Sequence, residues 1–377
     1  MKKNLFILAA AALALTACNN DELVESNAKS ASNEISFRPL VNNATRAASV
    51  TEVTTANLSS FVVNAMEAST TTSYFSGATY TKQGDGSFTC SAKYYWPATE
   101  SLDFYAYAPN GNSQVTYTDY KTFTVTPTAG TNPANQVDLV YAATKSKNKA
   151  TNATGVVLNF RHTGAKIVCK VQNTSSALKF GVEGWKVGYL SPSGTFTFAD
   201  ANTDVQNTGS GTTLTYGQWG NWGARSVDTE YASTFTKKDI AASASATDLD
   251  GEMILVPQTL TAATDYAATT ENAKLNGTFI AVKLYILNAA DSKLIAGGGT
   301  TASPTTIWAI WPIGGYNWEP GKKYTYTIDL AGGGYYEQNN ADGDDDLDPL
   351  LEGAEIKFVS VTVDNWTDVA KDVLGGI

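Results

Sequence analysis

The feature of this sequence that most limits its fold is an alternation of apolar side chains with period two. It recurs in segments containing Phe61, Val63 and Ala65; Val156, Leu158 and Phe160; Ile167, Cys169 and Val171; Val282, Leu284 and Ile286; and Tyr324, Tyr326, Ile328 and Leu330. Successive side chains of a strand point to opposite faces, so this period predicts strands with one buried face. No long apolar stripe at helical spacing occurs between residues 47 and 377. Because Gly, Asn, Asp and Pro clusters separate the segments, the sequence predicts an all-β protein of antiparallel sandwiches.

The length of 377 residues predicts two domains, each able to bury its own core. Residues 142–155 lack large apolar side chains and are locally basic, so we expect the boundary there, between a domain at 47–153 and one at 154–377.

Cys90 and Cys169 each lie in phase with apolar neighbours. This favours two separately buried thiols, although a disulfide between them stays open.

The first 18 residues are typical of a secretory signal peptide. Lys2 and Lys3 precede a short apolar run that ends in small residues and Cys18. The run is shorter than the ~20 residues that cross a bilayer. A cysteine at this position predicts a bacterial lipoprotein acylated at Cys18, and the alternative is an ordinary signal peptide with an incidental cysteine.

Charge and composition argue against nucleic-acid binding and catalysis. The formal net charge is −10, and no Lys or Arg cluster offers the positive surface that a phosphate backbone needs. The single histidine, His162, lies between two apolar strands, which favours a structural role. No nucleophile elbow, P-loop or dinucleotide fingerprint occurs. We therefore expect no enzyme, no cofactor and no metal site.

One acidic segment keeps calcium binding open as an alternative. Residues 339–349 include the aspartates Asp342, Asp344, Asp345, Asp346 and Asp348. Oxygen-rich loops of this kind can hold calcium. Their spacing differs from that of an EF-hand, however, and acidic turns are usually solvated.

A short segment near the N-terminus has the pattern of an edge strand. Ile35 and Phe37 point to one face and their neighbours to the other, while Pro39 tends to end the strand. Downstream, Arg46 lies in a polar connection of the sort that proteases enter. Removing such a strand would expose unpaired backbone groups and an apolar slot, which invites strand addition.

Several stretches together resemble the fimbrillin family, the subunits of type V pili in Bacteroidales. They are EISF ahead of TRA, YYWPATESLDFYAYAP (94–109), LNFRHTGAKIVCKV, ILVPQTL (254–260), WEPGKKYTYTIDL (318–330) and IKFVSVTVDNWTD (356–368), in the expected order. The resemblance implies two transthyretin-like β-sandwich domains in tandem. It also implies a structural subunit that supports adhesion, first exported as an outer-membrane lipoprotein. The acidic NNDELVE after Cys18 resembles the surface-export signal of such lipoproteins.

The resemblance further implies an assembly route. An arginine-specific surface protease removes the N-terminal segment with its first strand, and a strand from a neighbouring subunit fills the groove. In this sequence the cut is expected between Arg46 and Ala47, which makes residues 19–46 a propeptide. Arg38 is a competing site, but Pro39 follows it, and trypsin-like enzymes cleave Arg-Pro bonds poorly.

The C-terminal segment is the possible donor strand, with Val359, Val361 and Val363 in phase. The expected partners are other fimbrillin subunits, in a homo- or hetero-polymer, and a host or bacterial surface glycan or protein. The place along the filament stays open.

Two alternatives remain. One is a tip or accessory adhesin of the same family. The other is a tethered glycan-binding lipoprotein whose tryptophan rings stack on sugars. The candidates are Trp219, Trp222, Trp308, Trp311 and Trp318. Packing within the sheets is the favoured interpretation of these rings, because IWAIWP alternates like a buried strand.

Overall fold

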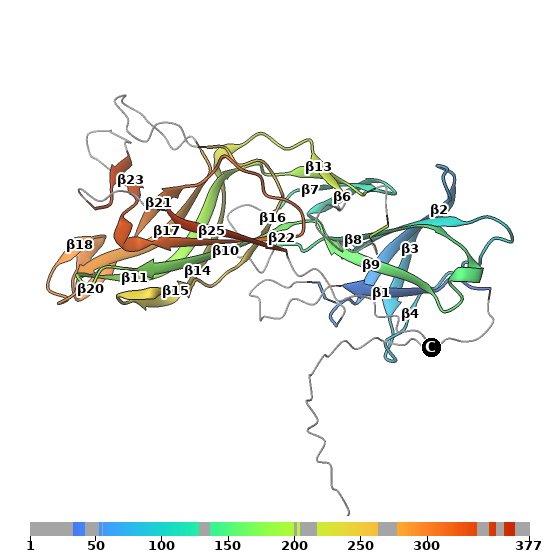
Figure 1. The fold of residues 1–377 in the computed structure, drawn as a ribbon, viewed down its shortest axis with the longest axis horizontal. Helices are drawn as coiled ribbons and strands as arrows, with labels where there is room; N and C mark the ends of the chain where they lie inside the picture. The colour runs from blue at the N-terminus through green and yellow to red at the C-terminus, as the bar shows by residue number, and fades with distance from the viewer. Residues whose placement is uncertain are drawn as a thin grey trace, which may run out of the picture.

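The computed structural model describes residues 33–41, 53–54, 56–127, 136–199, 202–203, 217–262, 277–337, 347–351 and 358–365. Every regular element in these ranges is a strand or a short 3-10 helix, so the chain is all-β, as predicted. The molecule is elongated, with its sheets gathered in two bodies that lie end to end (Figure 1). Among the described residues, no helix has the length and apolar character needed to cross a membrane.

The first body is built on a seven-stranded sheet in the order β1-β9-β8-β5-β2-β3-β4. Its strands are β1 (Phe37–Val41), β2 (Ser60–Glu67), β3 (Ser73–Lys82), β4 (Phe88–Thr89), β5 (Leu102–Ala108), β8 (Val140–Lys147) and β9 (Val156–His162), and η2 (Lys149–Thr151) lies between the last two. β1 pairs with β9 in parallel. Phe37 of β1 and Tyr80 of β3 touch, with ring centroids 4.8 Å apart, although their strands lie toward opposite ends of the order. The sheet therefore curls around its own apolar core.

A four-stranded sheet covers the other face of this curled sheet. Its strands, in the order β13-β12-β7-β6, are β6 (Val115–Asp119), β7 (Thr122–Val125), β12 (Gly194–Thr197) and β13 (Gln218–Gly220). Phe123 and Phe196 pack there against Tyr141 in a second core. β2 is consequently buried on both faces, since Phe61 faces one core and Val62 the other. The prediction of one buried face per strand is wrong for this strand because a second layer lies on it.

The second body is a sandwich of two sheets. The smaller has the order β15-β10-β22-β25, and β16 also pairs with β10; the larger has the order β14-β11-β17-β21-β23-β24, and β18 also pairs with β17. The strands are β10 (Ala165–Asn173), β11 (Leu178–Leu190), β14 (Ser226–Ile240), β15 (Ser243–Asp248), β16 (Met253–Leu255), β17 (Phe279–Asn288), β18 (Leu294–Ala296), β21 (Ile307–Pro312), β22 (Lys322–Asp329), β23 (Tyr335–Glu337), β24 (Leu347–Pro349) and β25 (Phe358–Asn365). A small hairpin of β19 (Gly298–Thr300) and β20 (Ser303–Thr305) and the turn η3 (Leu330–Gly332) complete the described elements. The alternating residues predicted for β10, β17 and β22 face the shared core, which confirms that part of the sequence pattern.

The chain passes between the bodies after His162, whereas the sequence pattern placed the domain boundary within residues 142–155. β8 and β9 flank that segment and pair with each other in the first body. Ala142 and Ala143 are fully buried, one in each core of the first body, so their small side chains reflect packing rather than a linker. The chain later returns to the first body for β12 and β13, so a division at residue 153 separates strands of one sheet.

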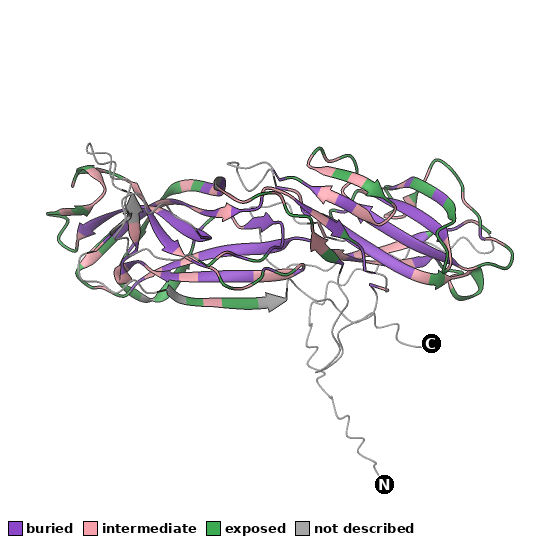
Figure 2. Ribbon diagram, turned by 90° about the horizontal axis from the view of Figure 1, so that it is seen from above, coloured by how far each residue is buried: buried purple, intermediate pink, exposed green. Residues whose placement is uncertain are grey.

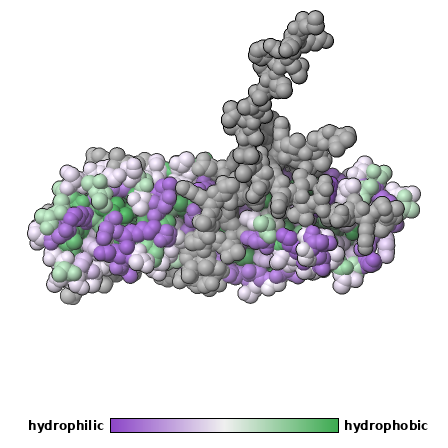
Figure 3. Space-filling model, turned by 90° about the horizontal axis from the view of Figure 1, so that it is seen from below, coloured by the Kyte–Doolittle hydropathy of each residue, from purple (hydrophilic) through white to green (hydrophobic). Residues whose placement is uncertain are grey.

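Polar contacts join the two bodies where the chain crosses. Trp219 donates its indole N–H to Thr163 O at 2.8 Å, and Ile254 N of β16 donates to Gln136 Oε1, ahead of β8, at 2.6 Å. Buried residues run along the strands of both bodies, while exposed residues gather in turns (Figure 2). On the face drawn in Figure 3, hydrophilic and hydrophobic residues are interspersed over the described surface.

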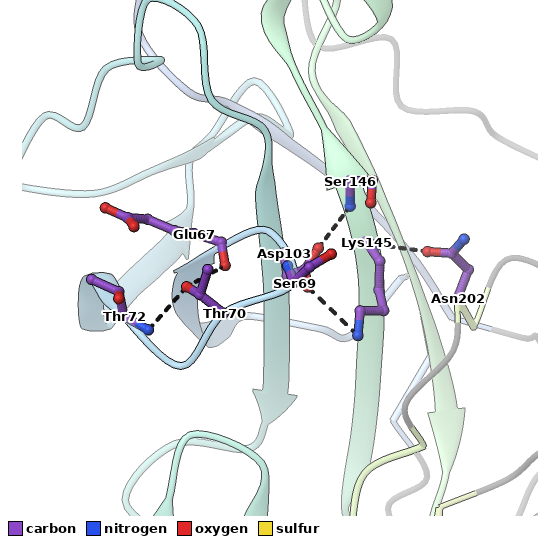
Figure 4. A network of polar contacts seen from close by, with 8 residues as sticks. All are labelled: Glu67, Ser69, Thr70, Thr72, Asp103, Lys145, Ser146 and Asn202. Carbon is purple, nitrogen blue, oxygen red and sulfur yellow. Dashed lines mark hydrogen bonds and ion pairs between the residues drawn. The ribbon is translucent and has the colours of Figure 1, made fainter.

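A buried carboxylate fixes the far end of the first body (Figure 4). Asp103 accepts hydrogen bonds from Ser146 N at 2.7 Å and Ser69 N at 3.4 Å, and Lys145 Nζ lies 3.5 Å away. Ser146 has a φ of 55°, a left-handed conformation that bends β8 toward the carboxylate. Because a buried charge must be compensated, these donors are what allow Asp103 to lie inside the sheet.

Candidate assembly site

The residues that the sequence predicted as a removable strand lie in the centre of the first core. Ile35 and Phe37 are each 2% exposed, and Val41 of the same strand is also buried. The Phe37 ring meets the rings of Phe104 and Tyr80 at centroid distances of 5.2 and 4.8 Å, both edge-on. We call residues 33–41 the plug segment.

Backbone hydrogen bonds hold the plug segment on both sides. Val156 N donates to Ser36 O at 2.8 Å, which begins the parallel pairing with β9. On the opposite side Ile35 N donates to Tyr94 O at 2.8 Å, and Trp96 N donates to Asn33 O at 2.9 Å. We call the space that the plug segment fills, between β9 and residues 94–96, the β1 groove.

Pro39 lies inside β1 and does not end it, contrary to the prediction. The strand continues to Val41, and Pro39 pairs with Leu158. Ser36 accepts from β9 whereas Ile35 donates away from it, so the backbone of odd-numbered residues is directed away from β9. The missing amide hydrogen of Pro39 therefore falls on the side that the ladder with β9 does not use.

A second anchor holds the chain shortly after the expected cut. Val53 N donates to Asp138 Oδ2 at 2.7 Å, and Asp138 Oδ1 lies 2.9 Å from His162 Nδ1. Both side chains are buried, so His162 orients a carboxylate that binds backbone, which is a structural role. Arg46 and Ala47 lie outside the described residues, between the plug segment and this anchor. Cys18 also lies outside them.

The strand predicted as a possible donor forms the edge of the smaller sheet in the second body. β25 pairs antiparallel with β22, with Val361 opposite Tyr326 and Val363 opposite Tyr324. Val361 is half-buried against the core, whereas Val363 is 51% exposed. Val359 lies in the strand, but its side chain is not among those described. Backbone pairing therefore holds the described part of this strand more than side-chain burial does.

The other residues singled out in the sequence lie apart from this site. Cys90 packs at the margin of the first core and Cys169 is buried in the second, so both thiols are free, as favoured. Burial raises the pKa of the Cys169 thiol.

Asp342 to Asp346 of the acidic segment lie outside the described residues, and Asp348 lies in β24. Among described residues, no group of three or more His, Cys, Asp or Glu side chains is arranged to hold a metal ion.

The candidate tryptophans mostly pack within the sheets. Trp311 and Trp318 are buried, Trp219 and Trp308 are half-buried, and Trp222 is exposed. The exposed ring donates its N–H to Pro257 O at 2.9 Å, which fixes it at the junction of the bodies. A row of exposed rings for stacking on sugars is thus not formed by these five residues.

The described chain is thus an all-β molecule of two end-to-end bodies, with a buried N-terminal strand and a C-terminal strand at a sheet edge. The family model described as Fimbrillin-like matches residues 45–366, and the chain belongs to that family. This family consists of structural and adhesion proteins, and membership supports a pilus-subunit role at the cell surface.

The chain is similar to several solved structures at low sequence identity, and the first of them, with a TM-score above 0.5, shares its fold. A fimbrial protein from Bacteroides vulgatus ATCC 8482 is 15% identical with a TM-score of 0.56, over 89% of this chain and 99% of that one. A proposed cell adhesion protein from Bacteroides ovatus ATCC 8483 is 14% identical with a TM-score of 0.43, over 90% and 99%. A fimbrial assembly protein from Parabacteroides distasonis ATCC 8503 is 11% identical with a TM-score of 0.34, over 84% and 98%. Among curated proteins, none matches this chain.

Proposed function

We propose that this protein is a structural subunit of a type V pilus that polymerises by donor-strand exchange. In this proposal it reaches the cell surface as an outer-membrane lipoprotein acylated at Cys18. An arginine-specific protease then cuts between Arg46 and Ala47, and the plug segment leaves. The observation that carries the proposal is the burial of Ile35 and Phe37 in the first core, although both lie ahead of the cut.

Loss of the plug segment would leave a state that demands a replacement strand. Each of the large apolar side chains that it buries contributes about 1.5–3 kcal/mol. Its departure also removes the backbone partners of Val156 and Tyr94. An open groove with unpaired backbone groups and an apolar floor is the geometry that strand addition satisfies.

The pairing of Arg38 within β1 argues against Arg38 as the cut site and leaves Arg46 as the proposed one. Arg38 lies within β1, where its backbone pairs with Val157 and its side chain is half-buried. A protease needs an accessible, extended segment, and a residue paired within a sheet does not offer one. The anchoring of Val53 by Asp138 would keep the new N-terminus attached to the first body after the cut.

The finer architecture and the partners belong to the same proposal. In this proposal the two bodies are tandem transthyretin-like sandwiches. The chain returns from the second body to add β12 and β13 to the first. The partners are other fimbrillin subunits, the arginine-specific protease and a surface glycan or protein that the filament contacts. No bound ion or cofactor is required, since strand exchange uses only backbone pairing and apolar burial.

Limited trypsin digestion tests the cut and its consequence together. A trace of trypsin is expected to remove residues up to Arg46, leave a compact core and start oligomer growth, followed by mass spectrometry and light scattering. The Arg46→Ala variant should remain intact and monomeric under the same digestion. Lys293→Ala, an exposed site in the turn before β18, is the matched control and should behave as the unaltered chain. Trimming and assembly of Arg46→Ala as before would refute the proposal.

The same experiment separates a stalk subunit from a tip subunit. A stalk subunit both accepts and donates a strand, so its trimmed chains should form long oligomers. A tip subunit accepts a strand without donating one, so its trimmed chains should remain monomeric and bind an added donor peptide.

A further inference from the structure

One tryptophan at the junction of the two bodies is exposed and yet held in place. Trp222 follows β13, which lies where the bodies meet (Figure 1), and it is 43% exposed. Its indole N–H donates to Pro257 O at 2.9 Å, which fixes the orientation of the ring. Because this donor is already used, the ring offers a partner only its flat apolar surface.

The turn that carries Trp222 is fixed on both sides of the ring. Asn221 before it has a φ of 48°, a left-handed conformation that asparagine adopts more readily than most residues. After it, Gly223 N donates to Ser193 O at 3.1 Å, and a Cβ at Gly223 would lie 2.8 Å from Ser193 Oγ, so the chain packs closely here. A ring that is ordered in advance loses little conformational freedom on binding.

The residues around the ring carry no charge. Residues 217–223 read GQWGNWG, and Ser193 and Pro257, which hold this turn, are uncharged as well. Trp219 and Val256 of the neighbouring positions line a narrow cleft between the two bodies, and none of the described residues that line this cleft is charged. A charged ligand would find no counter-charge among these residues, so the surroundings favour a neutral one.

The apolar surface at this turn is too small for the core of a protein interface. A stable interface buries about 800 Å² on each partner and has several apolar or aromatic side chains at its centre. The other exposed large apolar side chains of the described residues lie outside this turn and the segments that hold it; they are Tyr74, Tyr95, Ile295 and Val363. One indole face matches one sugar ring, whose C–H groups form a flat apolar face while its hydroxyls meet polar neighbours such as the exposed Asn221.

We propose that Trp222 is a stacking platform for a neutral pyranose ring of a surface polysaccharide. The inference rests on the proposed pilus function for its place on a filament, and it deepens that function by naming a ligand class. A single ring binds weakly. A filament repeats the ring in every subunit, however, and many weak contacts with one polysaccharide together give firm attachment.

Affinity electrophoresis of the intact chain tests the site. The probes cast into native gels are the neutral hydroxyethyl cellulose and galactomannan and the anionic alginate. At least one neutral polymer should retard the unaltered chain, and alginate should not. Tyr74→Ala removes a ring of the first body that is 39% exposed, so it is the matched control and should migrate as the unaltered chain does. Retardation by alginate alone, or by no polymer, would overturn the inference.

Two variants separate stacking from the hydrogen bond of the ring. Trp222→Phe and Trp222→Leu both lose the bond to Pro257, but only the first keeps an aromatic face. Trp222→Leu should bind the neutral polymer roughly tenfold more weakly than Trp222→Phe does. Both should unfold at nearly the same denaturant concentration, which excludes misfolding as the cause. Equal retardation of the two variants would contradict stacking.

Oligomer growth after trimming at Arg46 is a separate readout for the proposed function. Retardation of the intact chain without oligomer growth would support the site and overturn the pilus proposal. Oligomer growth without retardation would overturn the site alone. If Trp222→Leu blocks oligomer growth and no neutral polymer retards the unaltered chain, Trp222 is a contact between subunits and the inference is wrong.

Discussion

β1 and β25 are both edge strands in their sheets, but they are held by different forces. The plug segment, which contains β1, is held by the burial of Ile35, Phe37 and Val41 and by backbone hydrogen bonds on both sides. β25 is held by pairing with one strand, and its Val363 is half exposed to solvent. Backbone pairing is readily exchanged for pairing with another strand, whereas apolar burial in a fitted pocket is not. Among the described residues, side-chain burial therefore fixes the first edge, and backbone pairing is the main contact of the last edge.

The largest difference between the two strands is expected when one apolar side chain is truncated on each, a buried one on β1 and an exposed one on β25. Phe37→Ala should lower the free energy of unfolding by about 3–5 kcal/mol, because it removes a ring packed among three others. Val363→Ala, on the exposed edge, should change it by no more than about 0.5 kcal/mol. Denaturant titration followed by tryptophan fluorescence measures both. Similar losses in the two variants would show that the edges are held alike.

The anchor beyond the cut can be tested against a surface ion pair. Asp138→Ala should lower the free energy of unfolding by about 1–3 kcal/mol, since it leaves Val53 N and the buried His162 without their acceptor. Asp291→Ala is the control, because the pair of Asp291 with Lys179 is exposed and should contribute about 0–1 kcal/mol. The Asp138→Ala chain should also be digested past residue 53 by a nonspecific protease. A digestion pattern identical to that of the unaltered chain would show that Asp138 does not anchor the chain at Val53.

Thiol labelling reports on the first body alone. Cys169 is fully buried and its thiol pKa is raised by burial, so a thiol reagent should not reach it in the folded chain. Cys90 is half-buried at the margin of the core that holds Phe37, so it should label faster after trimming at Arg46. Mass spectrometry of the labelled chain assigns the site. Faster labelling of Cys169 than of Cys90 on trimming would mean that the second body opens instead.

The smallest expected effect is a change of stability at high pH in the second body. Burial raises the pKa of Tyr324, which lies opposite Val363, from 10.0 to about 12. An unfolded chain ionises this phenol near pH 10, so the stabilisation is complete below that pH and declines as the pH rises from 10 toward 12. Tyrosinate absorbance should therefore rise in step with unfolding. Ionisation of Tyr324 near pH 10 in the folded chain, compared with a Tyr324→Phe variant, would contradict its burial.

The alternation of apolar side chains predicted which face of a single strand is buried. The alternation around Tyr326 and Ile328 identified a buried face because side-chain direction follows from strand geometry alone. The same reasoning placed Ile35 and Phe37 on one face of an N-terminal strand. Both predictions use only neighbours within a few residues.

Features set by distant partners could not be predicted in this way. Val53 and Asp138 are 85 residues apart, and nothing near either residue signals their hydrogen bond. Ala142 and Ala143 look like linker residues until the two layers that cover them are known. Pro39 stays within its strand because of which side pairs with β9, which depends on register.

The central claim is that the plug segment is removed before assembly, and the N-terminus of the chain in filaments tests it most directly. Mass spectrometry of the protein sheared from the cell surface should find that it begins at Ala47. A chain that still begins at an acylated Cys18 within the filament would contradict the claim.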